Sequence, residues 1–224
     1  MSALRAAVVI FGKELRTEFR TRELLNTTVV FVLMILILFS FTMDPTAEES
    51  RRFTSGLLWL AILFAGALML FPSFTREQAN DTLDALRMAP VPAFAIVLGK
   101  VLANFAFLTL AEWLMLPVFS VLYDVSLVRV LWQMLLVFAL GTLGLAVTGT
   151  AFSAVAAHAR MREMLLPLML LPLLTPVLIA SVEATAALLA REPQFDLTWV
   201  KILLGFDVVF LAATYLVADA LVEE

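Results

Sequence analysis

The stretch FTSGLLWLAILFAGALMLFPSF, residues 53–74, decides the fold class because it contains no charged side chain anywhere along its length. An α-helix needs about 20 mostly apolar residues to cross a hydrocarbon core about 30 Å thick. The whole chain has the same character, since 62% of its 224 residues are hydrophobic and 15% are charged, against about 25% charged in ordinary soluble domains. A transmembrane β-barrel would show short alternating segments instead. The sequence therefore predicts an all-α integral membrane protein.

Five further apolar runs flank this stretch, so the chain predicts six transmembrane helices. The predicted spans are 26–43, 53–74, 94–122, 127–157, 164–189 and 200–222. We expect residues 26–224 to form one transmembrane domain and residues 1–25 to form a separate amphipathic helix.

Lysine and arginine are distributed unevenly between the two sides of this predicted bundle. Ten of the 15 lie on the side of the N-terminus: Arg5, Lys13, Arg16, Arg20, Arg22, Arg76, Arg87, Lys100, Arg160 and Arg162. The other side has Arg51, Arg52, Arg129, Arg191 and Lys201. The positive-inside rule therefore places both termini in the cytoplasm. The formal net charge of -4 gives no basic face for nucleic acid.

The charged segment TREQANDTLDALRMAPVPAFAIVLGK, residues 75–100, carries a helix signal of its own between two apolar runs. Asn80 or Asp81 can cap a short helix, and Pro90 ends it. Apolar side chains alternate there with charged ones. Such a helix suits either docking into a partner's cleft or lying on lipid headgroups.

The N-terminal segment, residues 1–25, has an apolar stripe with basic residues opposite it. The stripe consists of Leu4, Val8, Phe11, Leu15 and Phe19 at three- and four-residue spacing. This pattern predicts an interfacial helix along the cytoplasmic leaflet. The alternative is a helix packed on the protein's own loops.

The residue composition argues against several kinds of functional site in this chain. The chain has no Cys and one His, His158, which we assign to a cytoplasmic loop. A single imidazole makes a poor metal or haem site. The sequence contains no G-x-x-x-x-G-K-[ST] motif for nucleotide phosphates. We expect no catalytic residue, bound cofactor or metal in this chain, so any ATPase activity would belong to a separate subunit.

Three acidic residues fall inside the predicted spans, where a charge is costly and marks a candidate functional group. They are Glu112, Glu183 and Asp207, all in the outer half. One interpretation is a shared proton or substrate path. The other is structural hydrogen bonding for Glu112 and Asp207, with Glu183 at the interface.

Two spans have unusual backbone residues. Pro167, Pro172 and Pro176 predict that the fifth span is kinked, or that it breaks and dips back near the outer face. In the fourth span, a face of small residues predicts close helix packing, with a hinge as the alternative. Its glycines are Gly141, Gly144 and Gly149.

The segment FTREQANDTLDALRMAPVPAFAIVLGK resembles the loop between spans two and three of ABC-2-type permeases, where an RE-x-x-x-G-x-L-x-x-L-x-x-[SA]-P pattern precedes a helix ending near a lysine. Asp81 stands where that pattern usually has glycine. Four further stretches are similar to the CcmB family: FGKELRTEFRTRELL, GLLWLAILFAG, GTLGLAVTGTAFSAV and REMLLPLMLLPLLTPVLIASVEAT. That family supplies the permease-like subunit of the cytochrome c maturation complex in the bacterial inner membrane.

The resemblance implies a CcmA-type ATPase, a CcmC-type haem-binding membrane subunit, a CcmD-type small membrane subunit and a CcmE-type haem chaperone as partners. ATP hydrolysis would release the haem-loaded chaperone, and haem and ATP would be bound by the partners. The resemblance assigns ATPase contact to the docking segment, residues 75–92. The matching residues are Arg76, Glu77, Asp81, Leu83, Asp84, Leu86, Arg87 and Pro90.

Two other functions are consistent with six such spans. One is an ABC-2 permease that exports a lipid, glycan or drug. The other is an ion-coupled secondary carrier that uses Glu112 and Asp207, although such carriers are typically built from internal repeats. For the CcmB-type function, the expected mechanism is mechanical: closure of the ATPase moves the docking helix, and spans two and three transmit the shift.

Overall fold

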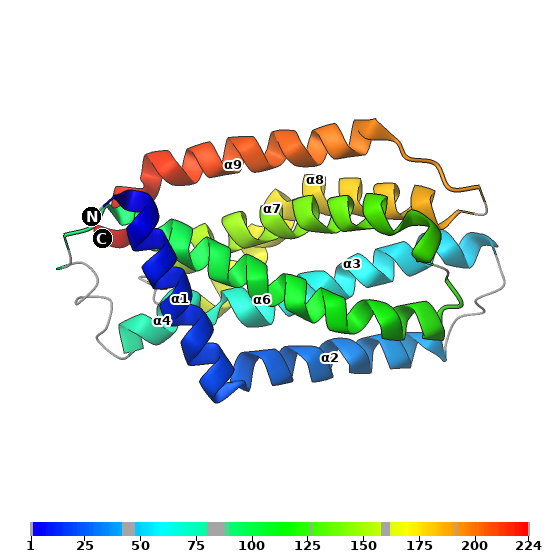
Figure 1. The fold of residues 1–224 in the computed structure, drawn as a ribbon, viewed down its shortest axis with the longest axis horizontal. Helices are drawn as coiled ribbons and strands as arrows, with labels where there is room; N and C mark the ends of the chain where they lie inside the picture. The colour runs from blue at the N-terminus through cyan, green and yellow to red at the C-terminus, as the bar shows by residue number, and fades with distance from the viewer. Residues whose placement is uncertain are drawn as a thin grey trace.

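The chain folds into a bundle of long helices in a computed structural model that describes residues 2–41, 48–79, 88, 90–125, 127–157, 162–190 and 192–223. The helices in these ranges are α1 (Ala3–Thr21), α2 (Glu23–Ser40), α3 (Glu48–Leu70), α4 (Pro72–Ala79), α6 (Ala93–Leu122), α7 (Leu131–Ala157), α8 (Arg162–Leu189) and α9 (Leu197–Glu223). A 3₁₀ turn, Val128–Val130, precedes α7. Figure 1 shows α2, α3, α6, α7, α8 and α9 side by side, with both termini at one end.

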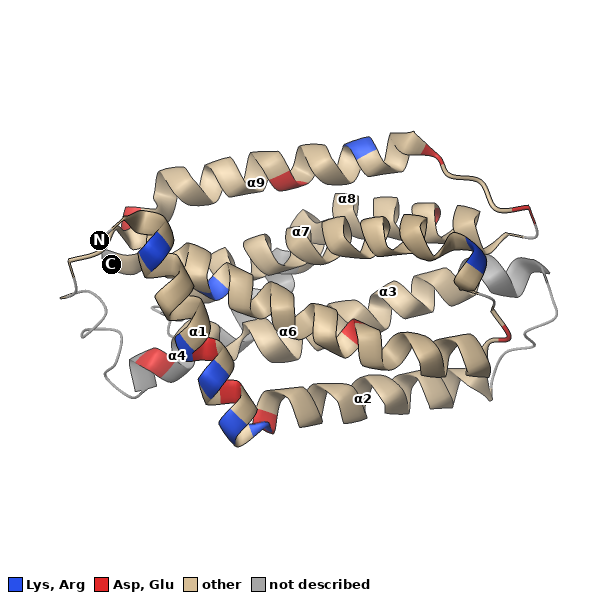
Figure 2. Cartoon of the chain, viewed as in Figure 1, with Lys and Arg blue, Asp and Glu red and all other residues tan. Residues whose placement is uncertain are grey.

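Six of these segments are long and apolar enough to cross a membrane: Glu23–Ser40, Phe53–Phe74, Ala93–Leu122, Val128–Ala156, Leu171–Leu189 and Leu197–Val222. The number of predicted spans is therefore confirmed. Charged residues gather at the two ends of the bundle and along α1, and few lie at mid-depth (Figure 2). The protein is an all-α, multi-pass integral membrane protein.

The centre of the bundle is α7, which packs against α3, α4, α6, α8 and α9. Its glycines allow this close approach. A Cβ built on Gly141 would lie 2.3 Å from Trp59 of α3, and one on Gly149 would lie 2.3 Å from Leu70. The close packing predicted for the fourth span is thus confirmed. Trp59 is fully buried, and its indole donates a 2.9 Å hydrogen bond to the Thr185 hydroxyl of α8.

The fifth span differs from one of the two predicted forms. The backbone of α8 is helical from Arg162 to Leu189 without interruption, so the break and return toward the outer face are wrong. Each proline removes one backbone donor, but the turns on either side keep their own hydrogen bonds. Beside Pro176, the Thr175 hydroxyl also donates to the Leu171 carbonyl at 2.9 Å. Pro172 and Pro176 both lie on the exposed side of the helix.

In the second predicted span, residues 53–74, the helix is interrupted before the apolar run ends. Helix α3 stops at Leu70, Phe71 forms a turn, and the separate helix α4 starts at Pro72. Proline suits the first position of a helix because its missing N–H has no partner there in any case. The new helix includes the first residues of the docking segment, 75–79.

Helix α1 lies across α6 (Figure 1). The two backbones meet where small residues face each other, Ala6 and Ala7 on α1 and Ala95 and Gly99 on α6. A Cβ on Gly99 would lie 2.8 Å from Ile10 and 2.9 Å from the Ala7 carbonyl.

The buried face of α1 is not the predicted apolar stripe. Leu4, Val8 and Phe19 are more than half exposed, while Ala7, Ile10 and Glu18 are buried. The helix therefore packs on a transmembrane helix, not on loops, and keeps part of its apolar stripe outward. The interfacial location of this helix stays a prediction.

Candidate functional site beside the docking segment

The most concentrated group of charges surrounds Lys100, in the third turn of α6, which is only 1% exposed. Its ammonium donates to the Glu14 carboxylate of α1 at 2.9 Å and to the Ser73 carbonyl of α4 at 2.6 Å. It also lies 2.9 Å from the Glu77 carboxylate of α4 and 4.9 Å from the centre of the Phe74 ring. The ammonium thus makes two hydrogen bonds, to Glu14 and Ser73, and an ion pair with Glu77.

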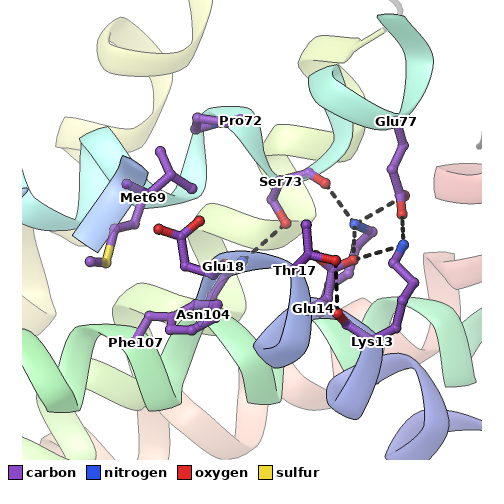
Figure 3. Close-up of a pocket in the computed structure, with 12 residues that line it drawn as sticks. Lys13, Glu14, Thr17, Glu18, Met69, Pro72, Ser73, Glu77, Asn104 and Phe107 are labelled. Carbon is purple, nitrogen blue, oxygen red and sulfur yellow. Dashed lines mark hydrogen bonds and ion pairs between the residues drawn. The ribbon is translucent and has the colours of Figure 1, made fainter. Parts of the chain in front are cut away.

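Lys13 completes this group of charges on the side nearest the protein surface. Its ammonium forms an ion pair with Glu77 and lies 3.2 Å from Glu14. Two ammonium groups and two carboxylates thus alternate, and their formal charges cancel. We call Lys13, Glu14, Glu77 and Lys100 the charge cluster; Figure 3 shows Lys13, Glu14 and Glu77 turned toward one another.

The cluster shifts the pKa values of its two α1 members. Burial opposes the charge of Lys13, but its hydrogen bond to Glu77 and the negative charges of Glu14 and Glu77 outweigh burial and raise the Lys13 pKa. Burial likewise would raise the pKa of Glu14, but the positive charges of Lys100 and Lys13 outweigh it and hold that pKa below its ordinary value. Both groups are therefore more firmly charged than they would be alone.

A chain of neutral hydrogen bonds extends the charge cluster toward α7. The Asn104 amide of α6 donates to the Ser73 hydroxyl at 3.1 Å and to the Thr150 hydroxyl at 2.8 Å. The Ser153 hydroxyl of α7 accepts from the Phe74 N–H at 3.3 Å, and this N–H lies in the first turn of α4, where backbone donors have no helical partner. Helix α4 is therefore held by α1, α6 and α7 together.

A cavity of about 270 Å³ borders the charge cluster, with Lys13, Glu14, Glu18, Glu77 and Lys100 among its lining residues. The backbone N–H of Leu25, in the first turn of α2, donates to the Glu18 carboxylate at 2.9 Å. The cavity thus has polar walls at the point where α1, α2, α4 and α6 meet.

The docking residues predicted from the sequence fall into three groups. Five lie outside the described residues: Asp81, Leu83, Asp84, Leu86 and Arg87. Arg76 belongs to α4, and Pro90 is exposed just before α6. Glu77 is buried, and its carboxylate contacts Lys100 within the bundle.

The three intramembrane acids are not brought together. The Thr142 hydroxyl of α7 donates to the buried Glu112 carboxylate of α6. Asp207 of α9 is also buried, and it packs over Gly144 of α7. Residues 142 and 144 are about 200° apart around an α-helix, so α7 separates the two carboxylates.

Glu183 of α8 is partly exposed and belongs to neither contact. This separation gives no support to a shared path through Glu112 and Asp207. Within the ranges that the structure describes, no group of three or more His, Cys, Asp or Glu side chains could hold a metal ion.

Sequence reasoning missed the charge cluster because it used Lys13 and Lys100 only to orient the bundle in the membrane. A signal was present: Lys100 lies seven residues beyond Ala93, well inside an apolar helix, where a charge needs a partner. Glu14 and Glu18 were the available acids on the amphipathic helix. Which acid would meet Lys100 depends on how α1 crosses α6, and spacing along the chain does not encode that crossing.

The fold and this site define a class: a polytopic α-helical membrane protein with an amphipathic N-terminal helix fixed to its bundle by buried ion pairs. The family model described as CcmB protein matches residues 5–223. The chain belongs to the CcmB family.

Curated relatives agree with this assignment. Heme exporter protein B of Rhodobacter capsulatus is 33% identical over 174 residues, which are 78% of this chain and 79% of that protein. Heme exporter protein B of Pseudomonas aeruginosa is 31% identical over 186 residues, 83% of each chain. The corresponding protein of Haemophilus influenzae is 27% identical over 170 residues, 76% of each.

Proposed function

We propose that this chain is the membrane subunit of a heme exporter complex for cytochrome c maturation, and that it couples ATP hydrolysis by a separate CcmA-type ATPase to haem handling. The family match across residues 5–223 and the names of the relatives support the first part. The coupling role rests on one observation, the anchoring of α4 by the charge cluster.

The geometry suits a helix that receives force. Helix α4 contains Arg76 and ends at Ala79, shortly before Asp81, the next proposed docking residue along the chain. Its other side is tied to α6 through Lys100 and to α1 through Lys13. A push on the docking segment would therefore reach α1 and α6 together, and α6 continues across the bundle to Leu122.

The proposed complex also contains CcmC-type and CcmD-type membrane subunits and the CcmE-type haem chaperone. In this proposal haem and ATP are bound by those partners, and hydrolysis releases the haem-loaded chaperone. The charge cluster would act mechanically in this chain, because it holds α4 at a fixed place until the ATPase moves.

We further propose that the membrane is the bacterial inner membrane and that both termini are cytoplasmic. Figure 1 places the two termini at one end of the bundle, the end where α1, α4 and the charge cluster also lie. The excess of lysine and arginine on that side supports the orientation.

The test is to replace Leu83 and Leu86 with Asp and to purify the complex through this subunit. We expect loss of the ATPase, because two carboxylates would be buried in an apolar contact. Phe195→Asp, in the loop between α8 and α9 at the other end of the bundle, is the matched control and should retain the ATPase. Normal ATPase stoichiometry in the Leu83 and Leu86 double variant would show that docking lies elsewhere.

A further inference from the structure

A groove opens on the side of the bundle between the start of α2 and the middle of α6, with a volume of about 340 Å³. Polar residues line the end at which α2 begins, Arg22 in the turn before the helix and Asn26 in its first turn. The remaining lining residues are apolar: Phe19 of α1, Leu25, Val29 and Val30 of α2, and Leu110 and Leu114 of α6. Along α2, the groove thus has a cation at its start and only apolar side chains beyond Asn26.

The backbone of Arg22 has a conformation that arginine rarely adopts. Its φ of 54° places it in the left-handed region, and Asp124 is the other non-glycine residue with positive φ in the described part of the chain. This position follows the end of α1, where glycine or asparagine is preferred because other side chains are strained there. The chain thus places an arginine at a backbone position that disfavours it.

The guanidinium of Arg22 is free to bind a ligand. Arg22 is exposed, and no ion pair to its side chain occurs among the described residues. Its level in the membrane is set by α2, whose candidate membrane span begins at Glu23. Arg22 thus lies where lipid headgroups begin, and the apolar walls lie deeper.

We propose that this groove binds one phospholipid, with the phosphate at Arg22 and Asn26 and an acyl chain along α2 and α6. A guanidinium forms paired hydrogen bonds with phosphate oxygens, and the Asn26 amide supplies further donors. The apolar walls lie deeper in the membrane than Arg22, as the acyl chain of a lipid lies deeper than its phosphate. This inference does not depend on the proposed function, because the ligand comes from the membrane itself.

The experiment uses the full chain and native mass spectrometry to count bound lipid. The probes are phosphatidylglycerol and diacylglycerol with the same acyl chains, so that only the phosphate and its headgroup differ. We expect the wild type to retain one phosphatidylglycerol and to bind it about tenfold or more tightly than Arg22→Gln, as loss of a charged hydrogen bond predicts. Arg22→Gly should lose the lipid equally while relieving the strained backbone.

Arg20→Gln, an exposed change in the last turn of α1, is the matched control and should bind the lipid within about twofold of the wild type. Leu114→Trp should displace the lipid by filling the groove while Arg22 stays intact. Equal retention by the wild type and Arg22→Gly would overturn the proposal, as would equal binding of diacylglycerol. Displacement of the lipid by millimolar inorganic phosphate alone, or a second protein copy lost in Leu114→Trp, would also overturn it.

Discussion

Removal of the Lys100 charge tests whether the charge cluster holds α4 to the bundle. Lys100→Met keeps most of the side-chain volume and leaves Glu14 and Glu77 with one ammonium between them. The exposed fractions of these side chains are 1% for Lys100, 23% for Glu14 and 8% for Glu77. Solvent therefore compensates little for the lost partner.

Loss of one member of a buried ion pair costs about 3–5 kcal/mol, because the other charge remains buried without compensation. Lys13 remains beside both acids, which places Lys100→Met at the lower end, about 3 kcal/mol. For a chain of this size, such a change lowers the melting temperature by roughly 6–12 °C. The four tryptophans allow thermal unfolding in detergent to be followed by intrinsic fluorescence.

The double variant Lys100→Met with Glu77→Gln makes the test specific to charge. It removes one charge of each sign, so the remaining Lys13 and Glu14 still balance. We expect it to be more stable than Lys100→Met alone. Lys201→Met, on the exposed side of α9, is the control and should unfold like the wild type. A melting temperature of Lys100→Met close to that of the wild type, or no recovery in the double variant, would refute the reasoning.

Three further outcomes are expected. Gly99→Ala should loosen the packing of α1 on α6, since the new Cβ would lie 2.8 Å from Ile10, and limited proteolysis should then cleave α1 faster. Gly56→Ala is the control: its Cβ would meet nothing within 4 Å, so cleavage should not change. The pKa of Glu14 is lowered in the folded state, so Glu14 stabilises the fold at pH values above its unfolded pKa of about 4.3, and this stabilisation is lost as the pH falls. In a series of melting temperatures measured at decreasing pH, Glu14→Gln should therefore show a smaller decrease than the wild type. Trp59→Phe should lower stability by about 1 kcal/mol in denaturant titrations, because it removes a buried hydrogen bond to α8.

The arrangement of spans could be predicted from the sequence because each crossing must satisfy its own backbone hydrogen bonds and therefore reads as a continuous apolar run. Helix α2 begins only three residues before its predicted start at residue 26. The close packing of the glycine-rich face of α7 was also predictable, since helices that approach closely have small residues where they meet.

Features that depend on contacts between helices were less accessible. Three prolines predicted a possible break in α8, yet the backbone around them stays helical because only single donors are lost. The predicted apolar stripe of α1 faces outward in part, since the crossing at Gly99 favours the face with Ala7 and Ile10. Glu77 matched a docking pattern by its position in the chain, whereas its burial is decided by Lys13 and Lys100 from two other helices.

The ion pair between Glu14 and Lys100 has a consequence for biosynthesis. The two residues are 86 positions apart, so the ribosome needs about 4–17 s after Glu14 to add Lys100, at about 5–20 residues per second. During that interval the partner helix of α1 is not yet complete. The outward apolar side chains Leu4, Val8 and Phe19 let the nascent helix rest on the bilayer surface until α6 is inserted. The order of synthesis thus gives the exposed stripe a role before the fold is complete.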